Sequence, residues 1–355
     1  MKRYFITHVC PQLLCGKYNI SYAASNFSWA LINSEVFDEC YSILPTNVRG
    51  NVDDIRMKEL IYSDLRKKNG LLQKIAVFVE NWTIFKKIES NSSVWLYNLS
   101  ILNILLFLLL KLFKPSVKVN IIILDIYIPA KRFSFENLLI WGQNHCDGTI
   151  RLSNSKFLTC RNSVCLPGVV AQNTPDFPKI NVVTKDFLLS GLLREDISQI
   201  SLVIKTFAAL PDFTLHITGF SDSDDLLREK CSKFTNIHYY GQIDFEKYIE
   251  LLHNTPFLLS MRDPFCLGNH ANFPSKVIEA ILHNRIIIST IHYEQLNGLK
   301  YFEVTSEKET LINELKRIVS MPTEELMCYA NQSSFVINNF SPKQWGVIMS
   351  KIENN

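Results

Sequence analysis

The stretch Asn-Phe-Pro-Ser-Lys-Val-Ile-Glu-Ala-Ile, residues 272–281, decides how this chain can be interpreted. It lies shortly after an apolar run at residues 256–261 and before the apolar run 286–289, which predicts a loop and a helix between two buried strands. Pro274 suits the first helical position, where a missing N–H leaves no helical bond unmade. The other N–H groups of that turn and the helix dipole favour an anion in the loop.

Two charged side chains extend this prediction. Lys276 supplies a mobile positive charge beside the expected anion, and Ser275 supplies a hydroxyl. Glu279 lies four residues after Ser275, so it shares that helix face, and its carboxylate can accept hydrogen bonds from sugar hydroxyls. The alternative is an ordinary Lys276–Glu279 ion pair, which stabilises a helix by only a few tenths of a kcal/mol. The nearby Arg262 and Pro274 favour a nucleotide-sugar site.

The second half of the chain alternates between short apolar runs and helical patterns. The run that ends at Gly191 is followed by a predicted helix over residues 197–210, and the next run stops at Gly219. Such alternation predicts a parallel sheet with right-handed crossovers, whose ligands bind at the carboxyl ends of the strands. Gly191, Gly219, Arg262 and Ser275 all fall at those ends.

The first half is also expected to be α/β, although its pattern is less regular. It predicts strands at residues 4–9, 119–126 and near 148–150, and a helix at residues 21–33. Pro175 and Pro178 mark residues 171–179 as a linker. We therefore expect a first domain over residues 1–175, a second over 180–335, and a terminal segment, 336–355, that packs back on the first domain.

Composition limits the classes of function. The net charge of +3 over 355 residues gives no reason to expect nucleic-acid binding. The nine cysteines lack the spacing of a zinc site, so we expect buried thiols in a reducing compartment and no metal. The first residues lack the apolar core of a signal peptide.

Residues 94–113 are apolar enough to raise the question of a membrane span. Asn98, Ser100 and Asn103 interrupt the first half of this segment, and a predicted strand follows Pro115. A core helix over residues 98–113 is therefore the preferred interpretation, ahead of a peripheral membrane contact or a true span.

The ordered signals of the second half resemble the GT-B glycosyltransferases, and more narrowly the retaining family-4 enzymes of bacterial surface polysaccharide synthesis. The resemblance covers about residues 185–320. The matching pieces are Ser190-Gly191, Leu215-His216-Ile217-Thr218-Gly219, Asn236-Ile237-His238-Tyr239-Tyr240-Gly241, Arg262, and the stretch 272–279. The first half resembles the family only in outline, through Asp125 and Pro129 and through Cys146-Asp147-Gly148.

The resemblance implies two Rossmann-like domains that face a central cleft, with the acceptor on the first and the nucleotide-sugar on the second. It implies transfer of a sugar, with retention, to a saccharide or lipid-linked saccharide, without a cofactor or metal ion. Arg262 and Lys276 would neutralise the leaving diphosphate, and Glu279 would bind the ribose. Further donor-binding candidates are Gly191, Arg194, Gly219, Asn272, Pro274 and Ser275; acceptor or cleft candidates are Gly16, Lys17, Asp125 and His145. The expected location is the cytoplasm, at the inner face of the membrane if the acceptor is lipid-linked.

The chain departs from the family pattern at three places in its second half. The basic residue that usually follows the first glycine has no clear counterpart, and Arg194 is the substitute candidate. Ala271 stands eight positions before Glu279, where many relatives have a second glutamate, which is similar to a shorter subgroup. Phe220 follows Gly219 where a second glycine is common.

Three further hypotheses remain open. A GT-B-like protein without catalysis could serve as a binding or assembly partner. A nicotinamide-dependent dehydrogenase has little support, because no Gly-x-Gly-x-x-Gly follows a strand. Basic residues beside aromatics, at 66–68, 82–87 and 113–114, are compatible with docking on an anionic membrane surface or with solvated helix faces.

Overall fold

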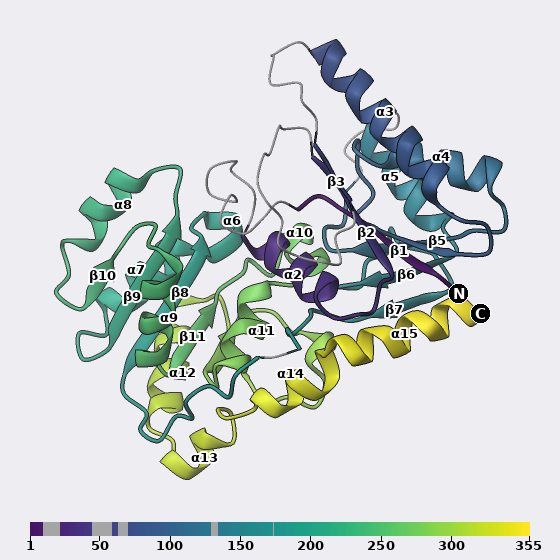
Figure 1. The fold of residues 1–355 in the computed structure, drawn as a ribbon. Helices are drawn as coiled ribbons and strands as arrows, with labels where there is room; N and C mark the ends of the chain where they lie inside the picture. Colours follow the sequence, from purple (N-terminus) through teal and green to yellow (C-terminus); the bar gives the residue numbers. More distant parts are fainter. Residues whose placement is uncertain (10–21, 45–58, 63–69, 129–133, 173) are drawn as a thin grey trace. The chain divides into compact units, whose positions relative to one another are not determined.

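The computed structural model describes residues 1–9, 22–44, 59–62, 70–128, 134–172 and 174–355. It divides into two compact units: unit 1 comprises Met1–Thr174 and Phe340–Asn355, and unit 2 comprises Pro175–Asn339. Each unit contains one parallel β-sheet with helices packed against it (Figure 1). The α/β class predicted from the alternating pattern is confirmed.

Unit 1 is built on a seven-stranded sheet in the order β3-β2-β1-β4-β5-β6-β7. Its strands are β1 (Arg3–Thr7), β2 (Glu39–Leu44), β3 (Glu59–Tyr62), β4 (Ser93–Tyr97), β5 (Lys118–Ile123), β6 (Gly148–Arg151) and β7 (Ser163–Cys165). Its helices are α2 (Tyr22–Ile32), α3 (Gly70–Lys87), α4 (Ile104–Phe113), α5 (Phe135–Asn144) and α15 (Pro342–Asn354). The central strands β4 and β5 are almost wholly buried, which explains their continuous apolar sequence.

Unit 2 is built on a six-stranded sheet in the order β10-β9-β8-β11-β12-β13. Its strands are β8 (Asp186–Leu192), β9 (Thr214–Phe220), β10 (Ile237–Tyr239), β11 (Phe257–Ser260), β12 (Ile286–Ser289) and β13 (Phe302–Glu303). Its helices are α6 (Glu195–Ser198), α7 (Ile200–Ala208), α8 (Asp224–Cys231), α9 (Phe245–Asn254), α10 (Leu267–Ala271), α11 (Ser275–Leu282), η2 (Glu294–Leu296), α12 (Lys308–Val319), α13 (Thr323–Met327) and α14 (Ser333–Phe340), the last of which reaches the boundary with unit 1.

Both sheets change the direction of strand addition beside their first strand. In unit 1, β1 pairs with β2 on one side and β4 on the other; in unit 2, β8 pairs with β9 and β11 in the same way. This is the strand order of a doubly wound sheet, in which loops on either side of the reversal diverge and leave a crevice at the carboxyl ends of the strands. The topology thus selects two places where a ligand can bind, one in each unit.

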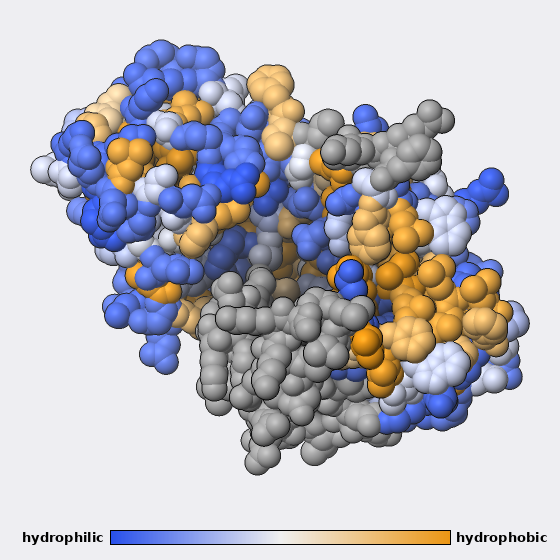
Figure 2. Space-filling view, turned by 90° about the horizontal axis from the view of Figure 1, so that it is seen from above, coloured by the Kyte–Doolittle hydropathy of each residue, from blue (hydrophilic) through white to orange (hydrophobic). Residues whose placement is uncertain are grey.

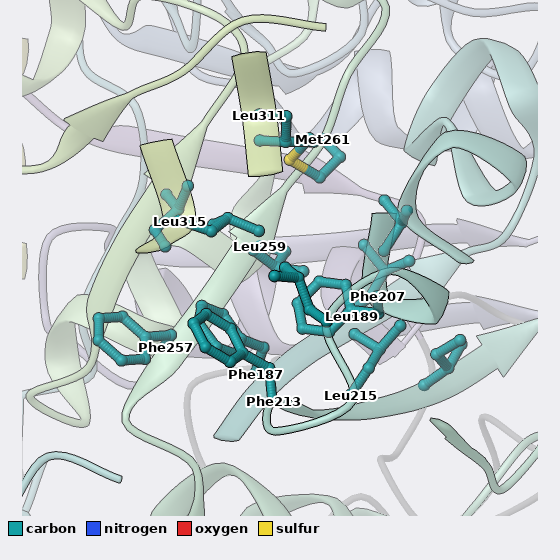
Figure 3. Packing of buried hydrophobic residues seen from close by; sticks show 14 of the residues in the cluster. Phe187, Leu189, Phe207, Phe213, Leu215, Phe257, Leu259, Met261, Leu311 and Leu315 are labelled. Atoms are coloured by element: carbon teal, nitrogen blue, oxygen red, sulfur yellow. The ribbon is translucent and has the colours of Figure 1, made fainter. Parts of the chain in front are cut away.

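The core of unit 2 is organised around Phe187 of β8 (Figure 3). Its ring centroid lies 5.1 Å from that of Phe207 on α7, 5.6 Å from Phe213 and 4.8 Å from Phe257 on β11. Leu311 and Leu315 of α12 complete the cluster. Burial of a side chain of this size stabilises the fold by about 1.5–3 kcal/mol. The contact of Phe187 with Phe257 joins β8 to β11 near the amino ends of both strands.

The apolar segment 94–113 forms a strand and a helix, so the prediction of one helix from residue 98 is wrong at its beginning. Asn98 has a left-handed backbone conformation, with φ of 47°. Its side-chain oxygen accepts from the backbone N–H of Leu124 (2.7 Å), and Asn103 Nδ2 donates to the Asn98 carbonyl (2.8 Å). These polar bonds fix a loop before α4. Across the described part of the chain, no helix combines the length and apolar character needed to cross a bilayer.

Two other predicted helix boundaries also need correction. The single helix expected over residues 197–210 is split into α6 and α7 at Gln199, whose φ of 45° is left-handed and redirects the chain. Helix α11 begins at Ser275, with Pro274 as its N-cap in an extended conformation, one residue later than expected.

Helix α15 belongs to unit 1. The buried Trp345 ring donates from Nε1 to the carbonyl of Gly168 (3.0 Å). Near the other end of α15, Glu353 accepts two bonds from Arg3 Nε (both 2.9 Å) and one from Trp95 Nε1 (2.9 Å). These contacts attach α15 to β1 and β4 of the unit 1 sheet.

Candidate functional site

The carboxyl edge of the unit 2 sheet brings together most of the residues predicted for the donor site. β8 and β9 run past this edge side by side, with Gly191 paired to Gly219. Both glycines have positive φ, 116° and 144°. A Cβ on Gly219 would lie 1.8 Å from the Gly191 carbonyl oxygen, whereas a Cβ on Gly191 would meet nothing within 4 Å. Gly219 is therefore required by the close approach of two backbones, and Gly191 by its conformation alone.

Arg262 lies two residues after the end of β11, at the point where the order of the sheet reverses. Its Nη1 donates to the carbonyls of Asn272 (2.8 Å) and Asn269 (3.4 Å), so the side chain closes the loop that precedes α11. Among the described residues, the guanidinium makes no ion pair and no further hydrogen bond. Burial lowers its pKa. Because a guanidinium has five N–H donors, Nε and Nη2 are left for a ligand.

Lys276 and Glu279 form the ion pair that was the alternative interpretation of this helix. Lys276 Nζ donates to Glu279 Oε2 at 2.9 Å. The structure adds a third member, Tyr248 of α9, whose hydroxyl donates to the same Oε2 at 2.9 Å. Lys276 Nζ also lies 3.8 Å from the centroid of the Tyr248 ring, which is a cation–π contact. Burial, followed by the neighbouring carboxylate, raises the pKa of Tyr248 well above its ordinary value, so the phenol remains a donor.

This arrangement orients the Glu279 carboxylate. One oxygen, Oε2, is held by two donors from two helices, and within the described residues Oε1 accepts no hydrogen bond. A carboxylate fixed in this way can present Oε1 to hydroxyl groups of a ligand. Sequence reasoning did not find Tyr248; the only local signal was its position one turn into a helix that follows a strand of the same sheet.

Asn269 is a second residue that the sequence did not reveal. It is buried, and its Nδ2 donates to the carbonyls of Asp196 (2.6 Å) and Asp263 (3.0 Å). It thereby ties α6, the helix after β8, to the loop after β11, across the reversal point. Its Oδ1 is buried without a partner in the described part of the chain.

The remaining donor-side candidates lie on the same loops but differ in whether neighbouring residues already bind their polar groups. Arg194, the residue before α6, is held by Asp196 through two hydrogen bonds of 3.0 and 2.7 Å, so it is engaged locally. Ser275 is exposed at the start of α11. Asn272 contributes its carbonyl to Arg262.

The acceptor-side candidates are not brought together. Asp125 follows the carboxyl end of β5, whereas His145 ends α5 just before β6 begins, at the opposite edge of the sheet. The His145 ring stacks on Trp141 with a centroid distance of 4.6 Å, and Nδ1 donates to the Trp141 carbonyl. His145 is therefore a helix-end residue that lies at the opposite edge of the sheet from Asp125. Gly16 and Lys17 lie outside the described residues.

The reversal point of unit 1 carries a different set of side chains. His8 follows β1, and its Nδ1 donates to the carbonyl of Ile43 (2.9 Å). Asn98 follows β4, and its Nδ2 donates to Asp125 Oδ2 (3.3 Å). Burial lowers the pKa of His8 to about 4 and raises the pKa of Asp125. The imidazole is thus neutral near pH 7, and Nε2 is its acceptor, 3.4 Å from Ser100 Oγ.

Comparison with known proteins identifies the architecture. No family model matches the chain, and no curated protein matches its sequence. Among solved structures, an Escherichia coli trehalose-6-phosphate protein bound to UDP-2-fluoro glucose is similar over 100% of this chain and 99% of its own, with a TM-score of 0.64 and 11% identity. A mutant of Staphylococcus aureus TarM, in complex with fondaparinux, α-GlcNAc-glycerol and UDP, matches 80% of this chain with a TM-score of 0.54 and 13% identity. This chain spans 59% of the TarM chain.

The fold is GT-B. A third GT-B structure, the UDP-GlcNAc 2-epimerase from Neisseria meningitidis bound to UDP-GlcNAc, is similar over 100% of both chains, with a TM-score of 0.56 and 10% identity. The GT-B fold therefore serves both sugar transfer and sugar epimerisation, so the activity must be argued from the residues of the site.

Proposed function

We propose that this GT-B protein transfers a sugar from a nucleotide-sugar donor to an acceptor hydroxyl, with retention at the anomeric carbon, as the family-4 resemblance implies. The observation that carries the proposal is the Tyr248–Glu279–Lys276 arrangement at the beginning of α11. It places a fixed carboxylate and a mobile cation about one helical turn apart, beside the reversal point of the unit 2 sheet.

In this proposal the basic residues stabilise the leaving group. Lys276 exchanges its ion pair with Glu279 for the donor diphosphate, and Arg262 presents its remaining N–H groups to the same phosphates. As the glycosidic bond breaks, negative charge grows on the diphosphate, and cations that are already in place lower the barrier. The two side chains would take the part that a metal ion plays in other transferases.

Glu279 binds the nucleoside in the same proposal. Its Oε1 accepts hydrogen bonds from the ribose hydroxyls, while Tyr248 keeps Oε2 in position. When Lys276 moves to the phosphate, Tyr248 remains the donor that holds the carboxylate. The flanking candidates Gly191, Gly219 and Ser275 supply backbone or hydroxyl contacts, and Arg194 and Asn272 lie on the same loops.

We place the acceptor, a saccharide or lipid-linked saccharide, at the carboxyl edge of unit 1, where Asp125 and Asn98 offer polar groups. The finer expectation is a hexosyl transfer in bacterial surface polysaccharide synthesis, such as capsule or lipopolysaccharide, at the inner face of the cytoplasmic membrane. This part of the proposal rests on the resemblance.

The test begins with thermal-shift screening of UDP-, GDP- and dTDP-sugars, because a ligand that binds only the folded state raises the melting temperature. Positive donors are then incubated with candidate acceptors, and free nucleoside diphosphate and glycosylated product are quantified. We expect Glu279→Gln to weaken donor binding without unfolding the protein. A product that is only an isomer of the donor sugar would instead indicate epimerisation. Binding without any turnover would favour the non-catalytic alternative.

A further inference from the structure

Two thiols of unit 1 lie in contact beside strand β6. Cys146 comes two residues after the end of α5, and Cys160 lies 14 positions later, in the loop between β6 and β7. Their side chains are hydrogen-bonded to each other, and both cysteines are free thiols. Neither thiol belongs to the proposed donor or acceptor site. The pair therefore calls for a chemical explanation of its own.

The two thiols differ in their access to solvent. Cys146 is buried, and its Sγ donates to the carbonyls of Gln143 (3.1 Å) and Gly148 (3.3 Å). The hydrogen bond with Cys160, followed by burial, raises the pKa of the Cys146 thiol, so this thiol keeps its proton. Cys160 is partly exposed. A reagent that arrives from solvent therefore meets Cys160 first.

The neighbours of Cys160 stabilise a thiolate. The hydrogen bond from Cys146, a further hydrogen bond with Thr149 and the positive charge of Arg151 lower the pKa of Cys160. Arg151 Nη1 donates to the carbonyl of Leu158 (3.4 Å), and Arg151 Nε is buried without a hydrogen-bond partner in the described part of the chain. Because the thiolate is the nucleophilic form of cysteine, Cys160 is placed to react.

The loop that carries Cys160 is basic. Elsewhere on unit 1 the surface is apolar, and Figure 2 shows hydrophobic residues gathered over α3, α4 and α5. The segment 148–175 contains no acidic residue and three basic ones, Arg151, Lys156 and Arg161. The carboxylate that precedes this segment, Asp147, is paired with Lys111 at 2.8 Å. The charge of the loop therefore favours an anionic reagent.

We propose that Cys146 and Cys160 form a reversible disulfide by exchange with a small anionic disulfide, for which oxidised glutathione is the probe. The Cys160 thiolate attacks one sulfur of the reagent, which forms a mixed disulfide and releases one thiolate. The Cys146 thiol then gives up its proton and attacks the Cys160 sulfur, which forms the protein disulfide and releases the second thiol. Two protein thiols are oxidised and one reagent disulfide is reduced, so the electrons balance. In a reducing compartment the dithiol is the resting form.

The proposed disulfide lies at the attachment of α15. Asn162, two residues after Cys160, donates from Nδ2 to the carbonyls of Asp147 (2.9 Å) and of Ile352 in α15 (2.8 Å). Asp147 follows Cys146 directly. The new bond would therefore link the two segments that this asparagine already joins. The modification belongs to unit 1 and the proposed donor site to unit 2, so its test does not depend on the transfer reaction.

Mass spectrometry of the full chain tests the proposal. Trypsin places the three neighbouring cysteines on three separate peptides: 133–151 with Cys146, 157–161 with Cys160, and 162–179 with Cys165. The reduced protein is incubated with oxidised glutathione, the remaining thiols are alkylated, and the peptides are analysed without reduction. We expect a linked pair of peptides 133–151 and 157–161, which dithiothreitol converts back to free thiols.

Two variants separate the roles of the thiols. Cys146→Ser should lose the linked pair completely and retain glutathione on peptide 157–161, because no second thiol displaces it. Cys160→Ser should lose the linked pair and leave Cys146 without glutathione, because the remaining thiol is buried. The matched control Cys328→Ser removes an exposed thiol of unit 2 and should leave the yield of the linked pair unchanged.

Three results with the unaltered protein would overturn the proposal, whatever the variants do. The first is no reaction at Cys160, and the second is a mixed disulfide on Cys160 that persists without a protein disulfide. The third is a link between peptides 157–161 and 162–179, which would make Cys165 the partner in place of Cys146.

Discussion

The carboxyl edges of the two sheets have the same topology but opposite chemistry. At the reversal point of unit 2, two glycines let the backbones approach, and the side chains beyond them are ionic: Arg262, Lys276 and Glu279. At the reversal point of unit 1 the side chains that the structure describes are largely uncharged, because burial keeps His8 neutral and Asn98 supplies most of the hydrogen bonds. One edge is suited to an anion, and the other to neutral hydroxyl groups. Duplicated topology therefore does not imply duplicated function.

The largest expected effect comes from the cation of the unit 2 edge. Lys276→Ala should lower turnover about 100- to 1,000-fold, the loss typical when a group that stabilises transition-state charge is removed. The matched control is Lys247→Ala, because Lys247 also forms an i, i+3 pair, with Asp244 at 3.3 Å on the neighbouring helix. Steady-state release of nucleoside diphosphate measures both. Equal activities of the two variants would mean that Lys276 is only a surface ion pair.

The next effect concerns the glycines that distinguish the two edges. Gly219→Ala should destabilise unit 2 by about 3 kcal/mol, because a side chain must adopt positive φ and also meet the Gly191 carbonyl. Gly191→Ala has the conformational strain without the clash, and should cost about 1–2 kcal/mol. Urea denaturation compares them; equal losses would show that the close approach of β8 and β9 is not limiting.

A smaller effect separates orientation from charge at the unit 2 edge. Tyr248→Phe removes one hydrogen bond to Glu279 and keeps the ring under Lys276. We expect KM for the donor to rise about three- to tenfold, with kcat nearly unchanged, since a hydrogen bond contributes about 0.5–1.5 kcal/mol. Tyr239→Phe is the control, because its hydroxyl also donates to a carboxylate, Asp224 of α8, away from Glu279. A fall in kcat alone would contradict the positioning role.

The smallest effect tests the neutrality of the unit 1 edge. The pKa of His8 is lowered from 6.5 to about 4, so the stability that depends on its neutral form is present above pH 6.5 and is lost as the pH falls toward 4. Between pH 7 and pH 6 we expect the free energy of unfolding to fall by slightly less than 1 kcal/mol, an order-of-magnitude value of about the size that this pKa shift implies. Thermal melts across pH 4–8 should show this slope, and His8→Gln should remove it. The exposed His145 provides the control through His145→Gln.

The sequence alone predicts the features that are determined by patterns within a few residues. Strands that end in Gly191 or Gly219, and the helix after Pro274, follow from patterns within a few residues, and the parallel topology places them at one edge. The Tyr248–Glu279 contact spans 31 positions and depends on how α9 and α11 pack, which no local pattern specifies. The role of Asn98 could not be predicted for a related reason. Inside an apolar segment, Asn98 looked like an interruption of a helix, whereas it lies in a loop and its side-chain oxygen accepts from the backbone N–H of Leu124.

The contacts of α15 have a consequence for the order of folding. Arg3 and Glu353 are separated by 350 positions, so the ion pair that closes the first strand of unit 1 needs residues synthesised after all of unit 2. Unit 2 is continuous in sequence and can reach its native contacts while the chain is still emerging. Unit 1 must keep its sheet incomplete until Trp345 and Glu353 arrive. Contacts between such distant positions form slowly, and unit 1 is therefore the part of the nascent chain that depends longest on protection from aggregation.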